Sequence, residues 1–183
     1  ETNPEMWVLS TSVRTAQLAA RQGIGYTFGL FPHASKDKIS AGREAADVYR
    51  AEFTPSAVMK EPRVMAAPFV VVADTNEEAS RLAKALDLWL LGKMNFSEFK
   101  RFPSVETAEK YTYTVEEVQK LSENRSRMVI GDAKSVKEQL ETLSEALTAD
   151  ELLLIPLMPK SENRQHAIEC LAAEFNLIKK EEG

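Results

Sequence analysis

Cysteine, histidine and glycine are scarce in this chain of 183 residues, which has one cysteine, two histidines and seven glycines. The single thiol, Cys170, excludes an internal disulfide and fits a reducing compartment. The two histidines, His33 and His166, are scattered, so the sequence predicts no Cys/His zinc site and no bound metal.

Long apolar runs and an excess of positive charge are also missing. The longest apolar stretches, residues 66–73 and 152–158, fall far short of the roughly 20 residues that span a bilayer. The net charge is −5, and Lys and Arg are interspersed with Asp and Glu. We therefore predict a soluble, cytoplasmic protein that binds neither membrane nor nucleic acid.

Short apolar runs alternate with longer segments of helical periodicity, which predicts an α/β fold with parallel strands. We expect strands at residues 6–10, 24–29, 64–72 and 151–157, and a return to the core at 128–131. Helices are expected at residues 12–22, from 38 to about 53, from 75 to about 92, at 114–124, at 135–147 and from 162 to about 180. The strand count fits either half of an eight-stranded barrel or a small doubly wound sheet.

Three local signals refine this pattern. Pro68 removes one hydrogen-bond donor from the third strand and predicts a bulge there. Capping boxes are predicted at residues 75–78 and 135–138. Between residues 93 and 127 the alternation breaks, so we predict a lid-like excursion within a single domain of residues 1–183.

A hydroxyl-rich corner joins the first strand to the first helix. Ser10, Thr11, Ser12 and Thr15 lie where the unpaired N–H groups of a helix start would face an anion. Two interpretations are open at this stage: the corner binds a phosphate, or a hydroxyl simply caps its own helix.

Residues 9–23, followed by 24–31, resemble the bacterial luciferase-like flavin monooxygenases. Further motifs of that family recur in order, at residues 49–56, 61–62, 71–79, 102–105 and 128–131. The resemblance implies a (β/α)8 TIM barrel of roughly twice this length, of which the chain would be the C-terminal half, strands five to eight. We therefore expect a fragment that is inactive by itself.

The same resemblance implies the site and the chemistry. The FMN phosphate would be held by Thr11, Ser12, Val13, Arg14 and Thr15, with Phe28 and Gly29 beside the flavin ring. Relatives carry a different sequence around His33, which argues against a flavin-facing role for it. The catalytic residues are expected in the missing first half. Reduced flavin, O2 and a small organic substrate are the implied partners of a bacterial FMN-dependent monooxygenase.

Two other functions compete with this one: a deazaflavin-dependent oxidoreductase of the same superfamily, and a non-enzymatic flavin-binding or assembly module. A half barrel would expose apolar interior residues, and we expect it to form a homo-oligomer for that reason. The residues expected on that exposed face are Val8, Phe28, Val70, Val72, Leu154 and Ile155. In the last helix we expect a solvated His166, and Cys170 packed with Ile168, Leu171 and Phe175.

Overall fold

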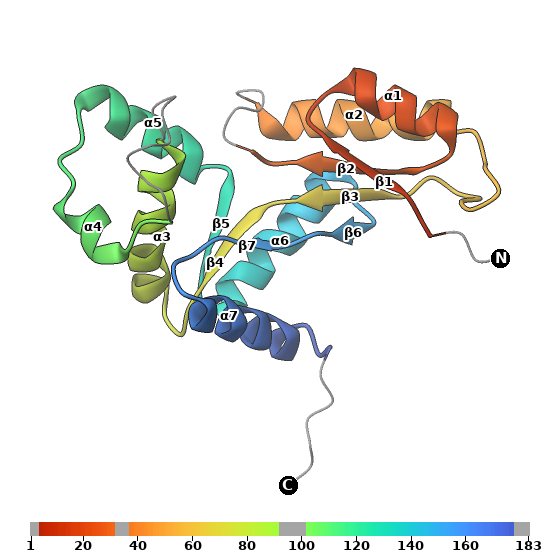
Figure 1. Ribbon diagram of the computed structural model, residues 1–183. Helices are drawn as coiled ribbons and strands as arrows, with labels where there is room; N and C mark the ends of the chain where they lie inside the picture. The colour runs from red at the N-terminus through yellow and green to blue at the C-terminus, as the bar shows by residue number, and fades with distance from the viewer. Residues whose placement is uncertain (1–3, 32–36, 92–101, 178–183) are drawn as a thin grey trace, which may run out of the picture. The chain divides into compact units, whose positions relative to one another are not determined.

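The computed structural model describes residues 4–31, 37–91 and 102–177 of the chain (Figure 1). These residues belong to two compact units, Glu1–Pro68 with Leu140–Leu154, and Phe69–Gln139 with Ile155–Gly183. Helix α6 (Ala133–Leu147) has residues in both units. The expected α/β fold with parallel strands is confirmed.

The first unit is a parallel sheet covered by two helices. Its strands are ordered β1-β2-β3-β6, with β1 at Trp7–Ser10, β2 at Gly25–Gly29, β3 at Val64–Ala67 and β6 at Glu151–Leu152. Helices α1 (Val13–Gln22) and α2 (Lys38–Glu52) pack against each other and against β2 (Figure 1).

Helix α1 begins and ends where the sequence predicts. Ser12 caps its N-terminus by accepting a hydrogen bond from the Thr15 N–H. Gly23 ends it with a φ of 60°, and a Cβ there would lie 2.5 Å from the Thr54 carbonyl oxygen. Glycine is therefore required at this turn by both its backbone angle and its close packing.

The two faces of β2 carry different side chains. Tyr26 and Phe28 point to the helices: the Tyr26 ring lies 5.7 Å from that of Tyr49 in α2, and Phe28 lies against Gly42 of α2. Strand alternation directs Gly25, Thr27 and Gly29 to the other face. The expectation of an exposed apolar face is wrong at three positions, because Phe28, Val70 and Val72 are buried.

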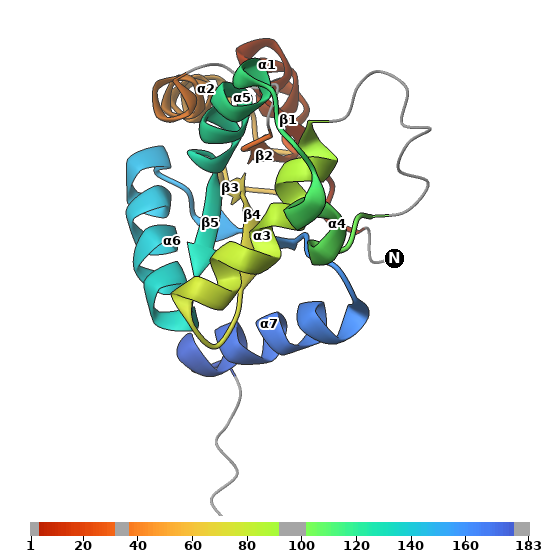
Figure 2. The same ribbon diagram turned by 90° about the vertical axis from the view of Figure 1, so that its left-hand side faces the viewer.

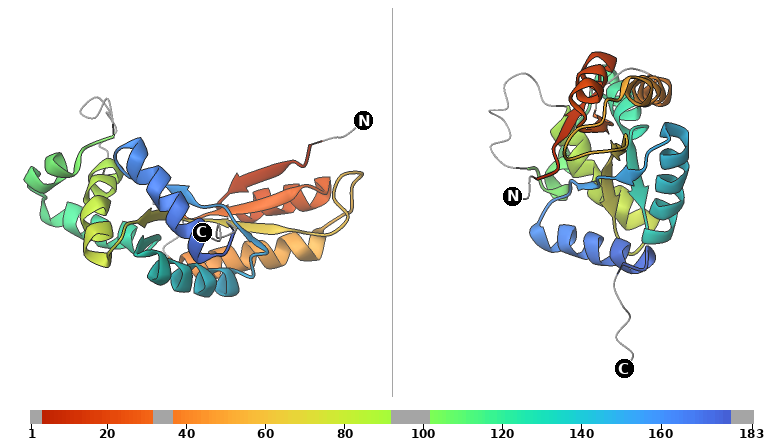
Figure 3. Two further views of the ribbon diagram at one scale, coloured as in Figure 1. Left: turned by 90° about the horizontal axis from the view of Figure 1, so that it is seen from below. Right: turned by 90° about the vertical axis from the view of Figure 1, so that its right-hand side faces the viewer.

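The second unit has a three-stranded parallel sheet in the order β5-β4-β7. Its strands are β4 (Phe69–Val72), β5 (Met128–Gly131) and β7 (Ile155–Pro156). Helix α3 (Asn76–Leu90) packs on β4 and β5, and α7 (Ser161–Glu174) packs on β4 and β7 (Figure 2). Helices α4 (Val105–Lys110) and α5 (Val115–Arg125) pack on α3 (Figure 3).

Each of the two longest predicted strands is divided in two. The stretch 64–72 forms β3 and β4, separated by Pro68, and the stretch 151–157 forms β6 and β7. Because proline has no N–H to donate, the ladder is interrupted at Pro68. Strand partners are nevertheless 86 residues apart in both sheets, as in Met65 with Glu151 and Phe69 with Ile155.

Capping signals were predicted with mixed success. Thr75 caps α3 by accepting the Glu78 N–H, but the return bond of the predicted box is not found between these two described residues. A complete capping box forms instead at Thr114 and Glu117 of α5, where the sequence predicted only a helix start. The capping box at residues 135–138 is wrong, because α6 starts at Ala133 and the Asp132 carboxylate accepts the Ser135 N–H at 2.8 Å. Of the excursion 93–127, residues 93–101 lie outside the described residues, and the rest contains α4, a helix that the sequence did not predict.

Candidate functional site

Three hydroxyl groups meet where β1 ends and α1 begins. The Ser12 Oγ lies 2.9 Å from the Thr15 Oγ1 and accepts the Thr15 N–H at 3.3 Å. The Ser10 Oγ accepts the Ser12 N–H at 3.2 Å. Thr11 and Ser12 are exposed, and Ser10 and Thr15 are half-buried. The corner therefore presents hydroxyl groups to solvent at the carboxyl end of a parallel strand.

The electrostatics of this corner favour an anion. The Ala16 N–H makes a helical bond to the Ser12 carbonyl at 3.2 Å, so the N–H groups of Val13 and Arg14 precede the helical ladder. The partial positive charge of the helix start is not offset locally, because the first turn of α1 has no acidic residue. The exposed Arg14 side chain adds a full positive charge beside it.

Together these donors fit a phosphate monoester. Hydroxyl groups, early-turn N–H groups and one guanidinium are the donor types that bind phosphate oxygens. The family resemblance implied five consecutive residues for the FMN phosphate, and all five lie at this corner: Thr11, Ser12, Val13, Arg14 and Thr15.

Phe28 and Gly29, the residues implied for the flavin ring, occupy the end of β2. Phe28 is 1% exposed and its ring faces α2, so only its backbone can approach a ligand on the opposite face. A Cβ on Gly29 would lie 2.8 Å from Cδ2 of the Phe31 ring. Glycine therefore lets Phe31 pack directly on the strand end. His33 lies outside the described residues.

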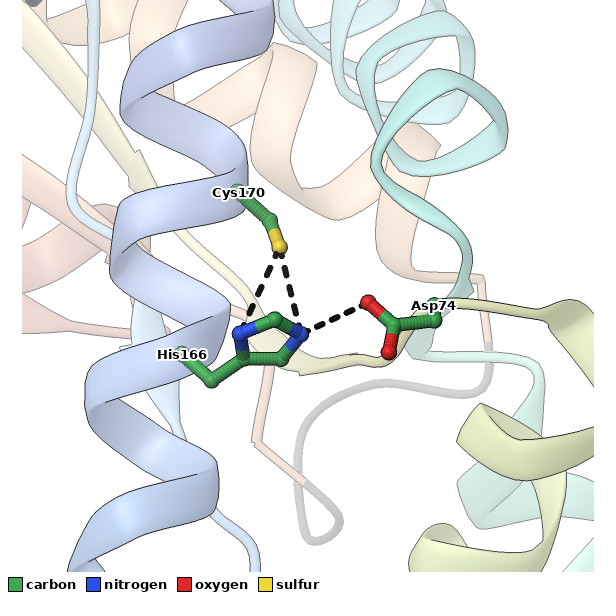
Figure 4. Close-up of side chains that lie close together, drawn as sticks. All are labelled: Asp74, His166 and Cys170. Atoms are coloured by element: carbon green, nitrogen blue, oxygen red, sulfur yellow. Dashed lines mark hydrogen bonds and ion pairs between the residues drawn. The ribbon is translucent and has the colours of Figure 1, made fainter.

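The strand ends of the second unit carry two aspartates with different partners. Asp132 follows β5 and caps α6, and hydrogen bonds from the Ser135 N–H and hydroxyl hold its pKa below the ordinary value. Asp74 follows β4 and lies 2.7 Å from Nε2 of His166. Cys170 lies beside this pair, with its sulfur 3.5 Å from the same nitrogen (Figure 4). The sequence did not predict this group of three side chains.

The second unit also has a pocket of about 360 Å³ between α3, α4 and the start of α7. It is lined by side chains of both charges, Glu78 and Glu106 on the acidic side and Arg81 and Lys160 on the basic side. With this balance the pocket has no preference for an anion, so the corner at Ser12 is the better candidate for a phosphate.

Parallel strands alternating with helices define a protein of the α/β class. Comparison with known proteins gives the family. Residues 1–151 match the model of the luciferase-like monooxygenases, and the chain belongs to that family. The resemblance found in the sequence is therefore confirmed, and membership of this family supports the assignment of the protein to the oxidoreductases.

Two relatives illustrate the extent of the match. The chain is 38% identical over 174 residues to YceB of Bacillus subtilis (strain 168), covering 95% of this chain and 51% of that protein. It is 27% identical to apo-MsnO8, with a TM-score of 0.80, covering 98% of this chain and 53% of that one. The chain thus spans about half the length of the relatives that it matches.

A more distant structure shares the fold alone. It is the oxygenating constituent of 3,6-diketocamphane monooxygenase from Pseudomonas putida, solved in complex with FMN. It is 16% identical to this chain, and the two structures superimpose with a TM-score of 0.53. The match covers 92% of this chain and 46% of that protein.

Among the described residues, no helix combines the length and the apolar character needed to cross a membrane.

Proposed function

We propose that the chain is the C-terminal half, strands five to eight, of an FMN-dependent monooxygenase barrel. The single observation that carries this proposal is the hydroxyl and N–H cluster at the start of α1, in a chain of the luciferase-like family. The half-length match to relatives supports the assignment to one half of a barrel.

The phosphate of FMN would bind at the start of α1. The hydroxyls of Thr11, Ser12 and Thr15 donate to its oxygens, and the N–H groups of Val13 and Arg14 add two further donors. The Thr15 hydroxyl, now 2.9 Å from Ser12, turns to the ligand while the Ser12 oxygen keeps the Thr15 N–H. The Arg14 guanidinium balances the phosphate charge.

The flavin ring would lie against the backbone at Phe28 and Gly29. Gly25 and Gly29 leave this face of β2 without side chains of its own, and the rings of Trp7 and Phe31 cover it. A flavin ring at Gly29 would take the place of the Phe31 ring or stack on it. Reduced FMN supplies the reaction with O2 and the transfer of one oxygen atom to a small organic substrate. This chain's residues hold and orient the cofactor and limit water around it.

The test compares two capping motifs of the same geometry. Ser104 and Thr107 at the start of α4 repeat the arrangement of Ser12 and Thr15, with hydroxyls 3.1 Å apart and a cap bond of 3.1 Å. Each serine-to-alanine change removes a helix cap, but only Ser12 would touch FMN. Ser104→Ala is therefore a matched control for Ser12→Ala.

Binding of FMN and of riboflavin is measured by fluorescence quenching with the protein expressed from its complete reading frame. We expect FMN to bind more tightly than riboflavin, and Ser12→Ala or Thr15→Val to reduce this preference by about tenfold, the value of one hydrogen bond to a charged group. Ser104→Ala and Thr107→Val should leave it unchanged. Equal losses in both motifs would contradict a phosphate site.

Formation of an oxygenated product distinguishes the three candidate functions, because free reduced FMN also consumes O2 by itself and forms peroxide. A monooxygenase supplied with reduced FMN, O2 and substrate transfers one oxygen atom to the substrate and releases the other as water. Binding of a deazaflavin in place of FMN, without O2 consumption, would favour the deazaflavin-dependent oxidoreductase. Binding of FMN with no turnover of any kind would favour the flavin-binding module.

A further inference from the structure

Three side chains of different chemistry converge in the second unit (Figure 4). Asp74 Oδ1 lies 2.7 Å from His166 Nε2, and Cys170 Sγ lies 3.5 Å from the same nitrogen. One donor atom from each residue lies within 4.8 Å of the other two. One carboxylate, one imidazole and one thiol thus share a single small volume.

Secondary structure brings the three residues together. His166 and Cys170 are four residues apart on α7, so they lie on one face of that helix. Asp74 directly follows Ala73, whose N–H donates to the Gly131 carbonyl at 3.3 Å and so fixes the exit from β4. The cluster therefore has two members on a helix and one at a strand end.

The geometry argues against a catalytic Cys-His-Asp relay. Such a relay needs the thiol on one ring nitrogen and the carboxylate on the other. Here Nε2 is the nearest ring nitrogen to both partners, and Nδ1 is 3.9 Å from the sulfur. Burial, followed by the charges of Asp74 and Glu169, also raises the pKa of the Cys170 thiol, which opposes a reactive thiolate.

We propose that Asp74, His166 and Cys170 bind a divalent transition-metal ion of the zinc class. Nitrogen, sulfur and carboxylate oxygen are the protein ligands that zinc prefers. In a tetrahedral zinc site the ligand atoms are about 3.3–3.5 Å apart, as the usual bond lengths require. The separation of His166 Nε2 and Cys170 Sγ, 3.5 Å, already has this value.

The Asp74 carboxylate would have to move to complete the site. Its oxygen must retreat from Nε2 to admit the ion and take a position at ligand distance from the Cys170 sulfur, and the side chain has room to do so because it is 71% exposed. The His166 side chain is 48% exposed, so water can reach the ion and occupy a fourth position. A bound ion would displace the proton of the Cys170 thiol to solvent, and the resulting thiolate and the Asp74 carboxylate would neutralise a divalent cation.

A bound ion would tie α7 to the end of β4. Because the ligands come from two elements that are far apart in the sequence, the metal would bind the folded unit better than the unfolded chain and would stabilise it. This inference is independent of the proposed flavin site, and its test needs no flavin.

The test is a titration of the metal-free protein, expressed from its complete reading frame, with Zn²⁺ and with Co²⁺. We expect one ion per chain, a rise in melting temperature, and a thiolate-to-cobalt charge-transfer band. Cys170→Ser should abolish the band, and Cys170→Ser, His166→Gln and Asp74→Ala should each weaken Zn²⁺ binding by about tenfold or more.

Two control variants separate the site from general attraction of cations. Glu169→Gln removes a nearby negative charge without removing a ligand, and His33→Gln removes the other imidazole of the chain. Both should bind Zn²⁺ as the unsubstituted protein does. The proposal is overturned if no saturable binding occurs, or if Cys170→Ser and His166→Gln, with unchanged circular dichroism, bind Zn²⁺ with full affinity.

Discussion

Arg125 of α5 forms a salt bridge with Asp87 of α3 through two nitrogens. Its Nε lies 2.9 Å and its Nη2 2.6 Å from the Asp87 carboxylate oxygens. Arg125 also reaches the Ser80 carbonyl at 3.3 Å. The Asp87 side chain is only 6% exposed, so it has little contact with water and its carboxylate oxygens accept hydrogen bonds from Arg125 instead. Helix α5, which belongs to the excursion expected to act as a lid, is thus fixed to α3 by an ion pair.

Arg125→Ala should destabilise the protein by about 2 kcal/mol, because it leaves the buried Asp87 carboxylate without its partner. Arg43→Ala breaks an exposed pair with Asp47 within α2 and should cost only about 0.3–0.5 kcal/mol. Urea unfolding measures both changes. Equal losses in the free energy of unfolding would mean that the burial of Asp87 does not strengthen its ion pair with Arg125.

Tyr49→Phe should cost roughly 2 kcal/mol of stability. The Tyr49 hydroxyl donates to the Ile24 carbonyl at 2.9 Å and accepts the Arg63 N–H at 3.3 Å, and both groups would lose a partner. Tyr26→Phe is the matched control, since its hydroxyl makes one long bond of 3.4 Å to the Ser10 carbonyl. We expect this control to lose less than about 1 kcal/mol. The same urea series tests the order of the two.

The stability of the chain should fall as the pH rises beyond about 10. Burial raises the pKa of Tyr26, Tyr49 and Tyr113, so these groups keep their protons in the folded state after the unfolded chain has lost them. The unfolded state then binds fewer protons, and the free energy of unfolding decreases with pH. Tyrosinate absorbance should follow the unfolding transition, and a smooth titration near pH 10 in the folded protein would contradict this.

Gly42→Ala should destabilise the protein although alanine normally favours a helix by about 1 kcal/mol over glycine. A Cβ at residue 42 would lie 2.6 Å from Leu147 Cδ2 and 2.9 Å from Phe28 Cδ1. Overpacking of this kind costs about 1–3 kcal/mol. A double-mutant cycle with Leu147→Ala measures the clash, and additive effects would show that the two side chains do not compete.

Leu9→Lys should weaken self-association of this chain. In the described sheet β1 has a neighbour only on the β2 side, and Leu9 is 45% exposed on this edge strand. Leu18→Lys is the control, because Leu18 is 59% exposed but lies on α1. Light scattering should give a smaller mass for Leu9→Lys alone. A monomeric unsubstituted chain would contradict the expected homo-oligomer.

Local signals in the sequence were sufficient for many element boundaries. Ser12, Gly23, Thr75 and Thr114 begin or end their helices as predicted, because a cap depends on residues within one turn. The error at α6 has the same origin: the stretch 135–138 also satisfies a capping pattern, but Asp132 caps the helix one turn earlier. Helix α4 has six residues, too few for a clear periodicity.

Contacts distant in sequence were not predictable in this way. Asp74 and His166 are 92 residues apart, and no local pattern links them. His166 and Cys170 are four residues apart, so the sequence alone places them on one helix face. It does not show that Asp74, at the end of β4, lies beside them. The expectation that Cys170 packs with Ile168 is wrong, since Ile168 is 57% exposed on another side of α7.

The shared separation of 86 residues in the two sheets limits where evolution can change the length of this chain. A residue gained or lost between 73 and 150 alters that separation equally for both strand pairs, and loops can absorb it. One inserted between 153 and 154 would shift Ile155 against Phe69 while Glu151 kept its place, turning alternate side chains to the wrong face. Alignment gaps among relatives should therefore gather in the helical connections and avoid the strand breaks beside Pro68 and Leu153.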